Sequence, residues 1–198
     1  MQQRTAALVL VAMVAGGGTL NALGASPAVR PEDAAIRVLI ASGIERSVTF
    51  RDLNTRLDNG DVTVYVRFSP CTGVPACLVW AGSGAGSRRL LVKLDRFGRS
   101  PDELTALLAH ELQHANEVAS APDVIDLRSF QKAFASRGWK HGAGFETEEA
   151  TRVTKKVAAE LAAYSAFIAT IGWTVVARRA AGSPASSATE IAIPDAIA

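Results

Sequence analysis

Two histidines and one glutamate with the spacing of a metal site lie near the middle of this 198-residue chain. His110, Glu111 and His114 form the pattern H-E-x-x-H, and the whole chain has only three histidines. On an α-helix, residues four apart lie on the same face, so the two imidazoles can reach one divalent ion. The glutamate between them can take a proton from a water molecule at that ion. The pattern therefore predicts metal-assisted hydrolysis.

The segment around the motif carries its own helix signals. Ser100 is a favourable N-cap, Pro101 suits the first helical position, and Glu103 completes a capping box. Pro122 ends the pattern about five turns later. Apolar residues recur at helical spacing and form one stripe, with the two histidines at its edge: Leu104, Leu107, Leu108, Leu112, Ala115 and Val118. These features predict the helix independently of the motif.

The motif segment resembles the active-site helix of the zincin metallopeptidases. Uncharged residues stand at Leu108, Leu112, Gln113 and Ala115, as in that signature, whereas Asn116 replaces a residue that is usually apolar. The resemblance covers about a dozen residues and implies one zinc ion, a peptide or protein substrate, and Glu111 as general base on a zinc-activated water. More loosely, the segment is similar to small exported bacterial proteins.

A catalytic zinc site needs a third protein ligand, and in the gluzincin subgroup that ligand is a glutamate on a later helix. The candidates here are Glu146, Glu149 and Glu160. Projected on a helix, Glu146 falls in line with apolar residues, namely Ala150, Val153, Val157 and Tyr164. A carboxylate aimed at a core requires a charged partner, which favours Glu146 as the ligand. The aspartate found in some gluzincins four residues after the ligand is replaced by Ala150.

Two further residues are candidates for the same site. Glu117 lies three residues after His114 on the motif helix, where a hydrogen bond to a histidine is the expected geometry and metal binding is the alternative. His141 could contact the substrate or a transition-state oxyanion, or lie on the surface.

The N-terminal residues predict export. A basic start ending at Arg4 precedes an apolar segment and then small residues before Pro27, so residues 1–25 are interpreted as a signal peptide, with an uncleaved anchor as the alternative. In a periplasmic or secreted protein, the two cysteines, Cys71 and Cys77, are expected to form a disulfide.

Length and composition indicate a single catalytic unit, residues 30–165, with 48% apolar and 20% charged residues over the chain. A net charge of +2 without a long basic run argues against nucleic-acid binding. The oligomeric state stays open. The predicted helices are 31–42, 49–57, the motif helix, 126–137 and one that begins near Glu146 or Thr147. A loop is expected at 139–145, and alternating or apolar segments predict strands at 62–68, 77–81 and 89–94.

We therefore expect an α+β domain in which a small, antiparallel sheet of about three strands packs against the motif helix and further helices. Residues 161–177 carry no charge and are followed by Arg178 and Arg179, which predicts a core helix or, alternatively, a membrane anchor. Residues 180–198 are interpreted as a disordered tail. The leading hypothesis is an exported zinc metallopeptidase. The alternative is a catalytically silent, zinc-stabilised binding or structural domain.

Overall fold

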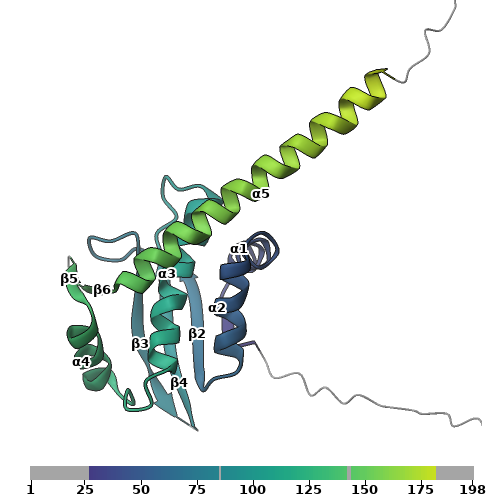
Figure 1. The fold of residues 1–198 in the computed structure, drawn as a ribbon. Coiled ribbons are helices and arrows are strands. Elements are labelled where there is room, and N and C mark those ends of the chain that lie inside the picture. The colour runs from purple at the N-terminus through teal and green to yellow at the C-terminus, as the bar shows by residue number, and fades with distance from the viewer. Residues whose placement is uncertain (1–26, 85, 142–143, 182–198) are drawn as a thin grey trace, which may run out of the picture.

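The computed structural model describes residues 27–84, 86–141 and 144–181 and shows an α+β fold (Figure 1). The predicted signal peptide lies outside the described residues, as does the predicted tail from residue 182 onward. The helices are α1 (Ala34–Arg46), α2 (Val48–Asp58), α3 (Pro101–Ala119), α4 (Leu127–Arg137) and α5 (Glu148–Ala181). The strands are β1 (Val29–Pro31), β2 (Val62–Phe68), β3 (Ala76–Gly84), β4 (Ser87–Leu94), β5 (Trp139–His141) and β6 (Gly144–Glu146).

The main sheet has the strand order β1-β2-β4-β3 and is mixed rather than antiparallel. β2 runs parallel to β1 and to β4, and only β3 is antiparallel to its neighbour. The predicted antiparallel, three-stranded meander is therefore wrong in its strand pairing. After β2 the chain first forms the edge strand β3, and β4 then lies between β2 and β3. Leu90, Val92 and Leu94 of β4 are fully buried, which suits this central position.

One face of the sheet is buried beneath the helices. Val62, Val64 and Val66 of β2 point into the core, while Thr63, Tyr65 and Arg67 alternate toward the other face. Helix α3 lies against the sheet, and α5 crosses over α3 on the side away from it (Figure 1). The motif helix is thus enclosed between the sheet and α5.

Helix α3 is fixed at both ends. At its start, Ser100 and Glu103 form the predicted capping box, and Arg46 of α1 forms a bidentate pair with Asp102. At its end, the buried guanidinium of Arg88 donates hydrogen bonds to the carbonyl oxygens of Val118 and Ala121 and pairs with Asp61. A cation at this position also complements the negative end of the helix dipole. The motif is therefore carried by a helix with little freedom to shift.

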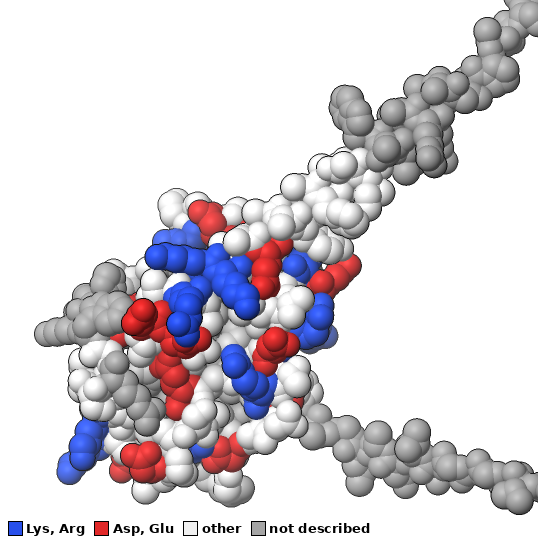
Figure 2. Space-filling view, viewed as in Figure 1, with Lys and Arg blue, Asp and Glu red and all other residues white. Residues whose placement is uncertain are grey.

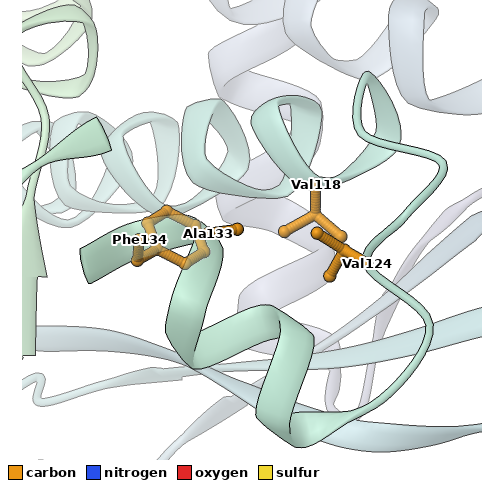
Figure 3. Close-up of a pocket in the computed structure, with 4 residues that line it drawn as sticks. All are labelled: Val118, Val124, Ala133 and Phe134. Atoms are coloured by element: carbon orange, nitrogen blue, oxygen red, sulfur yellow. The ribbon is translucent and has the colours of Figure 1, made fainter. Parts of the chain in front are cut away.

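Helix α4 packs against the C-terminal part of α3. Figure 3 shows Ala133 and Phe134 of α4 beside Val118 of α3 and Val124 of the connecting segment. Asp126 caps this helix together with Ser129, as the predicted boundary requires. The segment after α4, expected to be a loop, instead forms the short hairpin β5–β6, in which Trp139 pairs with Glu146.

Helix α5 leaves the body of the domain (Figure 1). Leu161 is fully buried, but Phe167 is 60% exposed and Ile168 is 49% exposed. The segment predicted as a core helix or membrane anchor thus starts buried, its side chains at residues 165–171 are exposed, and the projecting surface shows no charged side chains in Figure 2. The side chains of residues 172–177 lie outside the description. No helix in the described segments combines the length and apolar character that a membrane crossing requires.

Candidate metal centre

The two motif histidines lie on the part of α3 that α5 crosses. His114 is buried, His110 is half-buried, and their ring centroids are 4.8 Å apart. Each ring has two nitrogens, so the direction of each imidazole depends on the partner of its Nδ1 atom.

The ring of His110 is oriented by Thr154 of α5. Nδ1 of His110 lies 2.9 Å from Oγ1 of Thr154, and this hydroxyl donates its proton to the carbonyl oxygen of Ala150 at 2.8 Å. Because the single hydroxyl proton is used there, Thr154 accepts the Nδ1 proton of His110. This hydrogen bond selects the tautomer whose Nε2 lone pair faces the centre.

The ring of His114 is oriented by Glu117, as the sequence predicted for a hydrogen-bonding partner. Oε2 of Glu117 lies 3.1 Å from Nδ1 of His114, and Thr147 donates to Oε1 of Glu117 at 2.9 Å. Burial alone would lower the pKa of His114, but the hydrogen bond to Glu117 and the nearby carboxylates outweigh it and raise the pKa. Burial would raise the pKa of Glu117, yet its hydrogen bonds with His114 and Thr147 lower it.

Glu146 brings the third donor. Its Oε2 atom lies 3.2 Å from Nε2 of His110, and its Oε1 atom lies 3.7 Å from Nε2 of His114. One ligand atom from each of the three residues falls within 4.8 Å of the others, so the group could hold a metal ion. Glu146 is the last residue of β6, not part of the helix on which it was projected. Thr147 accepts from the backbone N–H of Ala150 and caps α5, which leaves Glu146 outside the helix.

Glu111 lies beside this group and is 5% exposed. Burial raises the pKa of its carboxyl to about 7. The charge of His114 and a hydrogen bond from the backbone of Leu78 oppose this rise, while the charge of Glu146 adds to it. A carboxyl group with a pKa near neutrality can both accept and release a proton. Its contact with Leu78 also connects the motif helix to the edge strand β3.

Glu149 and Glu160, the other predicted glutamate ligands, do not belong to the group of three donors. Glu149 pairs with Arg152 on the same helix. Glu160 accepts hydrogen bonds from the hydroxyls of Ser47 and Thr49 and from the backbone N–H of Thr49, so it caps the start of α2. His141 is in β5, and its side chain lies outside the part of the chain that the structure describes.

Thr147 and Thr154 are the residues of this centre that sequence reasoning missed. Thr147 carried a usable signal, because a threonine directly before two glutamates is a favourable helix cap. Thr154 carried none, since a threonine inside a helix does not indicate which neighbouring helix it faces. Its role follows only from the crossing of α5 over α3.

The predicted disulfide between Cys71 and Cys77 is present. The loop that it closes forms part of the wall of a cleft of about 570 Å³, which also contains the motif residues and Glu146. The centre is thus reached from an open cleft between β3, α3, α4 and β6. The chain matches none of the protein-family models, curated proteins or solved structures with which it was compared.

Proposed function

We propose that this chain is an exported, zinc-dependent peptidase in which His110, His114 and Glu146 hold the ion. The observation that carries the proposal is the convergence of both Nε2 atoms on the Glu146 carboxylate. Two imidazoles and one carboxylate form a donor set of catalytic zinc sites. When bound, zinc would supply Lewis-acid activation of a water molecule and of the peptide carbonyl.

The residues of the chain suit the remaining steps. Glu111 is buried next to the three donors, where its carboxylate can take the proton of the attacking water and pass it to the leaving amine. Strand β3 is an edge of the sheet and lines the same cleft, so an extended peptide could pair with its backbone and lie across the centre. This arrangement agrees with the zincin resemblance of the motif.

The silent zinc-stabilised domain receives less support from the geometry. That alternative expects Glu117 to join Glu146 on the ion and close the site. Glu117 instead makes hydrogen bonds with His114 and Thr147, and the donors face a cleft.

Glu111→Gln tests the proposal against this alternative. The variant should keep its zinc and lose hydrolysis of a mixed peptide library, because the amide cannot accept the proton. Glu149→Gln is the matched control, since Glu149 pairs with Arg152 away from the donors, and it should cleave like the wild type. If Glu111→Gln cleaves as fast as the wild type, the proposed mechanism is wrong.

A further inference from the structure

The wall of the cleft beyond the metal donors is apolar. Among the described lining residues, the charged or titratable side chains are those of His110, Glu111, His114 and Glu146, all within the candidate centre. The remainder of the wall comes mainly from aliphatic, aromatic and proline side chains of β3, α3, α4, β6 and the loop that the disulfide closes. Leu127 is 51% exposed and Phe145 is 39% exposed, so both present apolar surface to incoming molecules.

A row of aromatic rings joins this wall to the centre. Trp80 of β3 lies 5.9 Å from Phe130 of α4, measured between ring centroids, and Phe130 lies 4.9 Å from Phe134. Phe134 in turn contacts the ring of His114, edge to face, at 5.2 Å. The apolar surface therefore begins next to a metal donor and continues outward along α4.

We infer that the cleft binds peptides through a bulky aliphatic or aromatic side chain next to the bond to be cleaved. This inference rests on the proposed function for the position of that bond. A charged side chain would lose its hydration here without meeting an opposite charge on the described wall, whereas an apolar one would gain by leaving water. The outer edge of β3, beside the wall, would hold the peptide backbone while the side chain enters the cleft.

Peptides that differ at one residue beside the cleaved bond test the inference. With Leu, Phe, Ala, Asp or Lys at that residue, kcat/KM should be about 10- to 100-fold higher for Leu and Phe than for Ala, as expected for burial of a large apolar side chain. The value of kcat/KM should be lower for the Asp and Lys peptides than for the Ala peptide. Equal rates for all five peptides, or a preference for Asp or Lys, would overturn the inference and leave the peptidase proposal intact.

Leu127→Arg provides the matching variant. Leu127 is half-exposed at the start of α4, so an arginine can be accommodated and would place a positive charge on the wall. The preference for Leu over Asp should shrink by about tenfold or more, as expected for an ion pair in a partly desolvated site. Val38→Arg, at a residue of α1 that is 68% exposed, is the control and should leave the preference unchanged. An unchanged preference in a folded Leu127→Arg variant would contradict the inference that this wall binds the peptide side chain.

Binding without turnover separates this inference from the proposed function. The same peptides are titrated into the Glu111→Gln variant, with affinity followed by calorimetry. If the Leu and Phe peptides bind more tightly than the others, and Leu127→Arg weakens that binding, the apolar binding site is supported even if the wild type cleaves nothing. Equal affinity for the Leu, Asp and Lys peptides would refute it.

Discussion

Replacing Thr154 by valine should weaken zinc binding although Thr154 is not a metal donor. Valine keeps the shape of the side chain and removes the hydroxyl that accepts the Nδ1 proton of His110 at 2.9 Å. Without this partner, the imidazole can rotate, which turns Nε2 away from Glu146, or adopt the other tautomer, which puts the proton on Nε2 and removes the lone pair that would bind the metal. Loss of such a partner typically weakens metal binding about 10- to 100-fold. That range corresponds to about 1.4 to 2.7 kcal/mol of binding free energy.

Thr151→Val is the matched control for this experiment. Thr151 lies on the same helix and donates to the carbonyl oxygen of Thr147 at 3.2 Å, just as Thr154 donates to Ala150. Both variants lose one hydroxyl that bonds within the helix, but only Thr154→Val loses the contact with the imidazole. Zinc affinity is measured by competition with a chromophoric chelator, and urea unfolding of the metal-free proteins checks that both fold. Equal zinc affinities for the two variants would refute the assigned role of Thr154.

Three further predictions follow from residues around the centre. Glu160→Ala should lower the free energy of unfolding by about 1 to 3 kcal/mol in urea titrations, because the start of α2 loses its carboxylate acceptor, while zinc affinity stays unchanged. Asp61, whose pKa is lowered by the hydrogen bond from Arg88, should stabilise the fold above about pH 4, and this contribution should fade as the pH falls through the folded-state pKa. The difference in unfolding free energy between wild type and Asp61→Asn should therefore be smaller at pH 3 than at pH 6, and an equal difference would contradict the assignment. Gly138→Ala should weaken zinc binding, since the added Cβ would meet the carbonyl oxygen of Glu146 and lie 3.0 Å from its carbonyl carbon, whereas Gly60→Ala should not.

The elements with strong local signals were predictable from the sequence. The structure confirms the helix start predicted from the capping box of Ser100 and Glu103, and the helix predicted at 126–137 begins with a cap at Asp126. Both depend on residues within one turn of each other, so no distant part of the chain is needed to recognise them. The α+β class followed from the periodicity of the segments, and the disulfide between Cys71 and Cys77 followed from the predicted export of the chain.

The pairing of the strands was not predictable at this level. Alternation along β2 indicates which side chains face the core, but it does not indicate which strand lies beside it. The parallel pairing of Val62 with Arg88 requires β3 to lie outside β4, and the short strand β1 adds a further parallel neighbour. Both features depend on contacts between distant segments.

Glu146 was expected to lie with the two histidines, but on a helix rather than on a strand. Its projection on a helix placed it with the core residues of α5, yet it is the last residue of β6 and reaches the histidines from a strand. The course of α5 was not predictable for a related reason. A charge-free segment indicates an apolar environment, but the sequence does not show where the body of the domain ends.

Metal analysis after dialysis tests the central claim most directly. The wild type and Glu149→Ala should each retain one zinc ion per chain, whereas His114→Ala and Glu146→Ala should lose it, because only the latter two variants lack one of the three converging donors. Full zinc retention by Glu146→Ala together with zinc loss from Glu117→Ala would contradict the ligand set. The ion would then depend on α3 and Glu117, and the silent binding domain would become the better account.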